Sequence, residues 1–186
     1  MKTILQVEDD PNDVFLFQHS MTKAGVTNPV QVATDGQQAI DYLQGTGKFA
    51  DREKFPFPCL VLLDLKLPYV MGLDVLKWIR EQFGAALTVL MLTASGEEAD
   101  ITAAYRLGAN GFLVKPSEAS KLCDMVTAIM DFWLTHNTLP HEPSPRFSTE
   151  RSARLVHSST PDFSAGRLPV NGTRREEWPH ETQSNP

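Results

Sequence analysis

The sequence predicts an α/β fold in which helices cover both faces of a doubly wound sheet of five parallel strands. Five short apolar runs alternate with segments whose apolar residues recur at helical spacing, which is the pattern of buried strands alternating with helices. Four of the runs lead directly into residues with reactive side chains. Sites in open α/β sheets form at the carboxyl ends of strands, so the same pattern predicts where function lies.

The apolar runs define the expected strands. They cover, in chain order, residues 3–8, 30–33, 59–64, 87–92 and 111–114. The central runs are nearly continuous in Leu and Val, as expected of strands that are buried on both faces. A long loop is expected over residues 45–58, which contain two glycines and two prolines.

Helices are expected after each strand. The first should begin at Pro11, with Asp10 as its N-cap, and end at Gly25. The others carry apolar residues at helical spacing, and these residues are expected to face the sheet. They are Ala39, Ile40 and Leu43 in the second helix, Leu73, Leu76, Ile79 and Phe83 in the third, Ile101, Ala104 and Leu107 in the fourth, and Leu122, Met125, Ile129 and Phe132 in the fifth.

Composition divides the chain at about residue 139. Residues 140–186 include seven prolines and only nine hydrophobic residues, and they carry six basic and six acidic side chains. Such a segment buries too little apolar surface to offset the entropy lost on ordering. We therefore expect one folded domain over residues 1–139 and a disordered tail over residues 140–186.

The composition also restricts the class of protein. The net charge of −6 falls within residues 1–139 and argues against general nucleic-acid binding. No apolar run approaches the length of a membrane span, and the first residues lack a signal-peptide pattern. Cys59 and Cys123 have no partners at metal-ligand spacing, so we expect buried free thiols in a cytoplasmic protein.

Acidic residues and a lysine are expected to meet at the carboxyl edge of the sheet. Glu8, Asp9 and Asp64 would repel one another there unless a cation lay among them. Their hard oxygen atoms, without His or Cys nearby, suit magnesium. A carboxylate can also attack phosphorus and form an aspartyl phosphate, whose charge magnesium and Lys115 would neutralise.

Two further residues fit the same chemistry. The Thr93 hydroxyl would hydrogen-bond a phosphoryl oxygen, and the small Ala94 would leave room for the incoming group. Each element alone has a more ordinary explanation, such as an acidic turn, a helix cap or a loop lysine. Four such elements, in order and each at the end of a different strand, form a specific combination.

In this combination the chain resembles the receiver domain of two-component response regulators over roughly residues 2–135. Ile4–Asp10 resembles the acidic-pair motif, Leu62–Pro68 the phosphoacceptor motif, Met91–Ser95 the switch-threonine segment and Gly108–Pro116 the closing motif. The resemblance implies a flavodoxin-like receiver fold in which a sensor histidine kinase donates a phosphoryl group to an aspartate.

The resemblance also implies a role for each matching residue. Asp64 is the expected phosphoacceptor, and the expected magnesium ligands are Glu8, Asp9, Asp64 and the backbone carbonyl of Lys66. Thr93, Ala94 and Lys115 would stabilise the phosphoryl group, and Thr93 and Phe112 would form the switch. The chain departs from the family at Met71, where an aspartate usually precedes the glycine of the third helix. That position is not a ligand, so phosphotransfer is not put in doubt.

A narrower resemblance points to the single-domain regulators that partner phytochrome-type histidine kinases. It is carried by Phe55–Pro58 in the long loop, Tyr105–Asn110 and Phe132–Asn137. It implies output through protein contacts, since no DNA-binding pattern follows the domain. Together with the aromatic end of the fifth helix, it predicts a homodimer formed through the strand 5–helix 5 side, beside which Phe112 is expected to lie. The alternative is that Phe132 and Trp133 cap the core.

Three other functions fit these residues less well. A phosphatase of the haloacid-dehalogenase type needs a second acid two residues after the nucleophile, where this chain has Lys66. A flavin carrier would need a phosphate-binding loop after the first strand, where Glu8–Asp10 would repel phosphate. A degenerate receiver that acts without phosphorylation would normally have lost one of the site residues, and none is lost. We therefore expect a phosphoacceptor switch rather than an enzyme.

Overall fold

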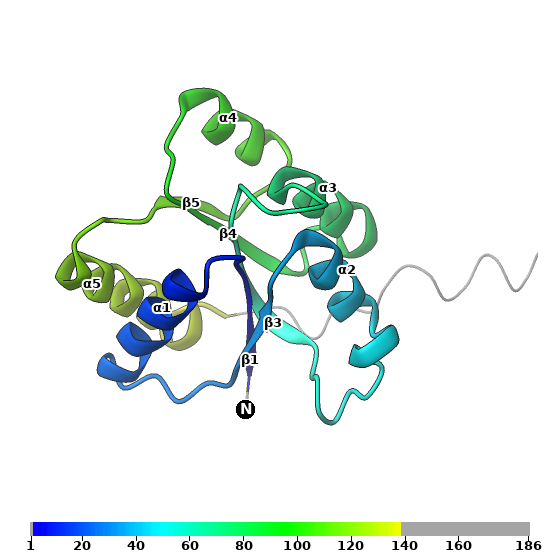
Figure 1. Ribbon diagram of the computed structural model, residues 1–186, viewed down its shortest axis with the longest axis horizontal. Helices are drawn as coiled ribbons and strands as arrows, with labels where there is room; N and C mark the ends of the chain where they lie inside the picture. The colour runs from blue at the N-terminus through cyan, green and yellow to red at the C-terminus, as the bar shows by residue number, and fades with distance from the viewer. Residues whose placement is uncertain (1, 139–186) are drawn as a thin grey trace, which may run out of the picture. The chain divides into compact units, whose positions relative to one another are not determined.

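The five expected strands form one parallel sheet. The computed structural model describes residues 2–138, and the strand order is β2-β1-β3-β4-β5 (Figure 1). The strands are β1 (Thr3–Val7), β2 (Val30–Ala33), β3 (Pro58–Leu63), β4 (Thr88–Thr93) and β5 (Gly111–Val114). The order places β1 and β3 in the centre, so the residues that follow these two strands come together in the middle of the carboxyl edge.

Helices cover both faces of the sheet, as predicted. They are α1 (Pro11–Lys23), α2 (Gly36–Gln44), α3 (Gly72–Phe83), α4 (Glu98–Arg106) and α5 (Ala119–Met130), with short helical turns η1 (Gly47–Phe49) and η2 (Asp131–His136). Figure 1 shows α1 and α5 side by side on one face, and α2 and α3 together on the other. No helix in the described part of the chain is long and apolar enough to cross a membrane.

Two apolar cores result from the alternation of side chains along the strands. Leu5, Val61 and Val89 point to the face of α2, α3 and α4, whereas the neighbouring Leu60 and Leu90 point to the face of α1 and α5. All five side chains are fully or almost fully buried. Near-continuous apolar runs are therefore needed in the central strands, because both faces are covered.

The expected start of the first helix is confirmed. The Asp10 side chain accepts a hydrogen bond from the backbone of Asn12 at 2.8 Å, and Pro11 occupies the first turn. Proline is favoured there because its missing N–H would have no helical partner. Asp35 caps α2 in the same way, through Gln38 at 2.7 Å. Both caps lie at the carboxyl edge, so they also fix how the chain leaves the strands.

The expected inward position of Phe132 is wrong, since its side chain is 54% exposed. The buried residues of α5 are Leu122, Val126, Ile129 and Met130, and Trp133 continues this face against the core. Phe132 follows three residues after Ile129 but lies outside the buried stripe. The wider π-helical winding of η2 begins at Asp131, so positions beyond it no longer follow the earlier spacing.

Two further expectations need comment. Cys59 and Cys123 are free, but each is partly exposed rather than buried. Cys59 is the second residue of β3, near the amino end of the strand. Cys123 lies beside the buried stripe of α5 rather than within it. The predicted tail over residues 140–186 lies outside the described residues, as does residue 139, the end of the predicted domain.

Candidate phosphoryl-acceptor site

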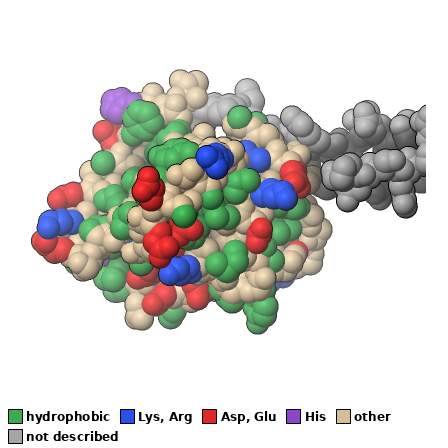
Figure 2. Space-filling view, turned by 90° about the horizontal axis from the view of Figure 1, so that it is seen from above, with side chains coloured by type: hydrophobic (Ala, Val, Ile, Leu, Met, Phe, Trp, Pro, Cys, Tyr) green, Lys and Arg blue, Asp and Glu red, His purple; other side chains and the backbone are tan. Residues whose placement is uncertain are grey.

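The reactive residues converge at the carboxyl edge of the sheet, as the strand pattern predicts. Glu8 and Asp9 follow β1, Asp64 follows β3, Thr93 ends β4 and Lys115 follows β5. The view onto this edge shows acidic side chains gathered near the middle of the face, with basic side chains beside them (Figure 2). Parallel strands bring these positions together although they are far apart in the sequence.

Three carboxylates form a cluster that fits a divalent cation. Oxygen atoms of Glu8, Asp9 and Asp64 all lie within 4.8 Å of one another. Glu8 is 3% exposed and Asp64 is 8% exposed, whereas Asp9 is exposed to solvent. Three hard oxygen donors with one side open suit magnesium or a similar ion, which keeps several of its water ligands.

Glu8 is an unusual acid in this cluster. Burial raises its pKa to about 7, and the hydrogen bond and charge of Lys115 only partly offset this effect. A buried carboxylate is costly to ionise unless positive charge lies nearby. A cation held with Asp9 and Asp64 would supply that charge, so the residues present fit a bound metal better than an empty acidic cluster.

Asp64 is held in place by the backbone around it. Its N–H donates to the carbonyl of Val7 at 3.0 Å, and its Oδ1 accepts from the N–H of Leu65 at 2.6 Å. The start of α3 packs directly against it, since a Cβ on Gly72 would lie 2.1 Å from the Asp64 carbonyl oxygen. Glycine is therefore required at residue 72 for α3 to approach the acid so closely.

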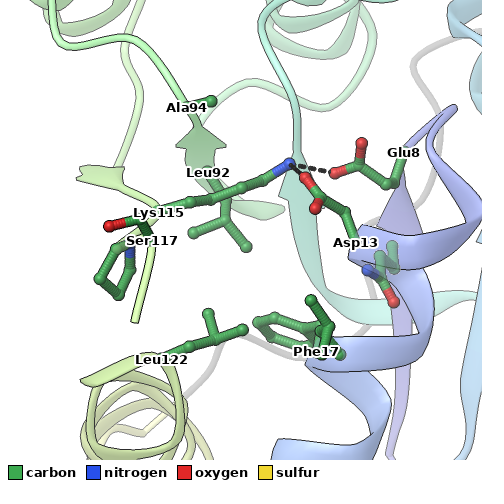
Figure 3. A pocket seen from close by; sticks show the side chains of 11 residues that line it. Glu8, Asp13, Phe17, Leu92, Ala94, Lys115, Ser117 and Leu122 are labelled. Carbon is green, nitrogen blue, oxygen red and sulfur yellow. Dashed lines mark hydrogen bonds and ion pairs between the residues drawn. The ribbon is translucent and has the colours of Figure 1, made fainter. Parts of the chain in front are cut away.

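Lys115 contacts three carboxylates from three different elements. Its Nζ hydrogen-bonds Glu8 and lies 2.8 Å from Oδ2 of Asp13 (Figure 3). It also lies 3.5 Å from Oδ2 of Asp64. Burial alone would lower the pKa of Lys115, but the hydrogen bonds to Asp13 and Glu8 and the charge of Asp64 outweigh it and raise the pKa. The lysine is therefore a fixed positive charge next to the candidate nucleophile.

Thr93 and Ala94 lie at the end of β4, next to Lys115, and their contact with a phosphoryl oxygen stays a prediction. Thr93 is buried, and its carbonyl accepts from the N–H of Lys115 at 2.8 Å. The backbone N–H of Ser95 lies 3.4 Å from the Thr93 hydroxyl. Ala94 is exposed and lines the cavity beside Lys115.

Phe112 lies on the opposite face of the sheet from α5. It is partly buried and packs against the core on the α2, α3 and α4 face, whereas its neighbour Leu113 points to the α5 face. The expectation that Phe112 lies beside the strand 5–helix 5 surface is therefore wrong. Strand alternation is the reason, since adjacent residues of β5 point to opposite faces.

The loop after Asp64 carries the remaining expected ligand. The side chain of Lys66 is exposed, and the role of its backbone carbonyl as a metal ligand stays a prediction. Tyr69 is 90% exposed and has a φ of 64°, which closes a tight turn where the N–H of Val70 donates to Pro68. The departure at Met71 has a visible effect, because α3 begins there without a side-chain cap.

Sequence reasoning missed Asp13. It lies in the first turn of α1, where an acidic residue favours the helix dipole, and this ordinary role conceals its contact with Lys115. Below the two side chains is a cavity of about 290 Å³ between α1 and α5. In Figure 3, Phe17 and Leu122 face each other across it. Its position in the chain could have identified Asp13, because the first turn of the helix that follows β1 lies at the carboxyl edge of the sheet.

Comparison with known proteins agrees with this geometry. Residues 4–127 match the model of the response regulator receiver domain. The chain belongs to the response regulator receiver family. The match spans all five strands from Ile4 and most of α5, so it includes every residue of the candidate site.

Several relatives align with this chain over nearly their whole length. The chain is 36% identical to response regulator Rcp1 of Synechocystis over 140 residues. This alignment covers 75% of the present chain and 93% of Rcp1. The phosphorylated cyanobacterial phytochrome response regulator RcpA superposes with a TM-score of 0.70 at 35% identity, covering 75% and 99% of the two chains. The Mn²⁺-bound form of Rcp1 gives a TM-score of 0.69 at 36% identity, covering 76% and 100%. No DNA-binding domain lies within the aligned region of Rcp1 or RcpA.

Proposed function

We propose that Asp64 of this receiver accepts a phosphoryl group from a sensor histidine kinase. The observation that carries the proposal is the position of the buried Asp64 carboxylate, which belongs to the acidic cluster and also lies 3.5 Å from the Lys115 ammonium group. Negative neighbours alone would make Asp64 a poor site for phosphate. The lysine and a cation in the cluster change this, because they offset the charge of the transferring group.

The transfer is a displacement at phosphorus. An oxygen of the Asp64 carboxylate forms a bond to phosphorus, and the bond from phosphorus to the donor breaks, so that the donor leaves with its electron pair. Lys115 keeps its proton and hydrogen-bonds a phosphoryl oxygen, while Thr93 donates its hydroxyl proton to another. Magnesium, held by Glu8, Asp9, Asp64 and the carbonyl of Lys66, would supply the remaining positive charge.

We propose a phytochrome-type kinase in the cytoplasm as the donor. The support comes from relatives, since RcpA is a phytochrome response regulator and Rcp1 resembles this chain over most of its length. The likeness includes the end of α5, which the receiver motifs do not need. A histidine phosphate is also the donor that a receiver of this architecture would use.

The protein acts in this proposal as a switch and not as an enzyme that turns over a substrate. The phosphoryl group would draw in the Thr93 hydroxyl, and Phe112 would follow into the space between β5 and α4. A switch of this kind changes the output only if the partner binds one conformation better than the other. The output would pass through a downstream protein and not through nucleic acid.

We also propose a homodimer through the side formed by β5 and α5. Val114 is 47% exposed and Phe132 is 54% exposed, although both are apolar. Phe132 is braced by Trp133, with ring centroids 5.0 Å apart. Sedimentation of phosphorylated and unphosphorylated protein would test the proposal, and monomers in both states at high concentration would reject it.

Incubation with acetyl phosphate and magnesium, followed by intact-mass measurement, tests the central proposal. The parent protein is expected to gain one phosphoryl group and Asp64→Asn is expected to gain none. Equal labelling of the variant would show that the acceptor is another residue. Steady release of phosphate from many small phosphate esters would instead favour a phosphatase of the haloacid-dehalogenase type. No labelling of a folded, metal-binding protein would favour a degenerate receiver.

A further inference from the structure

Among residues 2–138, Asp13 is the one carboxylate paired with Lys115 that does not belong to the acidic cluster. Its Oδ2 lies 2.8 Å from Nζ, closer than the 3.5 Å that separates Nζ from Asp64. Asp13 projects from the first turn of α1, whereas Lys115 follows β5 at the edge of the sheet. Figure 3 shows the lysine extended across Leu92 toward Glu8 and Asp13.

The three contacts use the ammonium group unequally. An ammonium has three protons to donate. Glu8 and Asp13 each accept one, because both contacts are hydrogen bonds. The third proton has no protein acceptor at hydrogen-bonding distance among the described residues, and the nearest carboxylate oxygen beyond the two bonds is Oδ2 of Asp64.

Two bonded protons restrict the position and rotation of the group. A lysine side chain has four rotatable bonds, and holding its end in one place costs conformational entropy. Glu8 approaches from the end of β1 and Asp13 from α1, so the two acceptors hold the amine from two separate elements. The 13% exposure of the Lys115 side chain shows that this position is also largely shielded from solvent.

We propose that Asp13 is a positioning residue for the phosphorylation of Asp64. It holds Lys115 so that the remaining proton is available to a phosphoryl oxygen as the bond from phosphorus to Asp64 forms. The inference rests on the proposed function at Asp64. Asp13 is not a member of the acidic cluster, and in this role it acts through its hydrogen bond to Lys115.

The test uses the rate of phosphorylation of the full chain by acetyl phosphate at saturating magnesium. Asp13→Ala is expected to lower the maximal rate about fivefold, with little change in the half-saturating donor concentration, because positioning affects the transition state more than donor binding. Asp13→Asn keeps a hydrogen-bond acceptor in the same place and is expected to recover part of the loss. An unchanged maximal rate in Asp13→Ala would overturn the inference.

Asp74→Ala is the matched control. Like the partly buried Asp13, the exposed Asp74 is an acid in the first turn of a helix. Its removal reproduces the loss of charge and of helix-dipole stabilisation without touching Lys115. Its rate is expected to stay within twofold of the parent. A loss equal to that of Asp13→Ala would show a general effect of charge and would reject the role assigned to Asp13.

A double-mutant cycle separates action through the lysine from a structural effect. In a Lys115→Met background, Asp13→Ala is expected to change the rate less than twofold, because there is no ammonium left to position. The same fivefold loss in that background would overturn the inference. Failure of the parent to become phosphorylated at Asp64 would reject the proposed function itself. Normal labelling of the parent with an unaffected Asp13→Ala would reject only the positioning role.

Discussion

Two partly buried cations lie at opposite ends of the sheet and are satisfied in opposite ways. Lys115, at the carboxyl edge, is surrounded by the carboxylates of Glu8, Asp13 and Asp64. Arg80 of α3 lies near the amino ends of β4 and β5. Within the part of the chain that the structure describes, it donates only to neutral oxygens at 2.8–3.0 Å, namely the carbonyls of Gly84, Leu87 and Gly108 and the side chain of Asn110.

The contrast separates a functional cation from a structural one. Carboxylates raise the pKa of Lys115, whereas burial without an anionic partner lowers the pKa of Arg80. The neutral oxygens hold the Arg80 guanidinium in one geometry. Those of Leu87, Gly108 and Asn110 also connect α3 to the residues that lead into β4 and β5. The acids around Lys115 repel one another and hold more negative charge than one lysine can balance, so these residues fit a bound cation.

The largest expected effect comes from removing the functional cation. Lys115→Met keeps the aliphatic stem and removes the charge. Phosphorylation of Asp64 by acetyl phosphate is expected to slow at least a hundredfold, which corresponds to about 2.7 kcal/mol of transition-state stabilisation. Rapid-quench labelling measures the rate. A decrease of less than threefold would contradict the role assigned to Lys115.

Removing the structural cation should lower the stability of the protein and leave the phosphorylation of Asp64 almost unchanged. Arg80→Met removes the guanidinium donor from three carbonyls and leaves the Asn110 side-chain oxygen with only its hydrogen bond from the N–H of Val89. The free energy of unfolding is expected to fall by about 2 kcal/mol. Urea denaturation measures the loss, and labelling of Asp64 should stay within twofold of the parent. If Arg80→Met had normal stability but could not be phosphorylated, Arg80 would not be the purely structural cation that the contrast with Lys115 assumes.

The metal is expected to complete the carboxyl edge. Asp9→Ala removes the exposed member of the acidic cluster and should weaken magnesium binding at least tenfold, or about 1.4 kcal/mol. Titration calorimetry measures the affinity. Asp10→Asn is the control, because Asn keeps the N-cap of α1 and the lost charge lies outside the cluster. Equal affinity in the parent and in Asp9→Ala would place the metal elsewhere.

The buried phenol of Tyr42, which lies away from the site, should give the protein a smaller, pH-dependent contribution to stability. Tyr42 is fully buried, and its hydroxyl donates to the carbonyl of Pro56 at 2.6 Å. Burial raises the pKa of Tyr42 to about 12 from an ordinary 10, and Arg52 only partly offsets this shift. The folded state therefore favours the protonated phenol. Its contribution is complete below pH 10 and is lost as the pH rises toward 12.

The matching experiment compares the parent with Tyr42→Phe. Between pH 9 and pH 11 the stability advantage of the parent should shrink by about 1 kcal/mol, because only the parent carries the shifted phenol. Tyr69 and Tyr105 are present in both proteins, so the comparison isolates the effect of Tyr42. A constant difference across this range would mean that the phenol titrates alike in the folded and unfolded chain.

The smallest expected effect concerns residues 140–186. Removing them should change the free energy of unfolding by less than about 0.5 kcal/mol and leave labelling of Asp64 unchanged, because their composition offers little apolar surface to bury. Thermal denaturation of the shortened and full chains measures the difference. A large loss of stability would show that the segment packs on the domain.

The sequence by itself determined the sheet and the residues at its functional edge. Apolar runs long enough for buried strands alternate with helical patterns, and parallel topology then forces Glu8, Asp64 and Lys115 to one edge. Each of these residues directly follows a strand, so a local pattern was enough to place it. The caps at Asp10 and Asp35 were equally local, because a cap acts within three residues of itself.

Only the tertiary structure decided which side chains touch across elements. Asp13 and Lys115 are 102 residues apart, and Arg80 reaches Asn110 across 30 residues. The outward turn of Phe132 and the inward side of Phe112 likewise depend on packing against neighbouring elements. A periodic pattern reports which residues share a face. It does not report where a long side chain ends, because that depends on the acceptors which the folded chain brings within its reach.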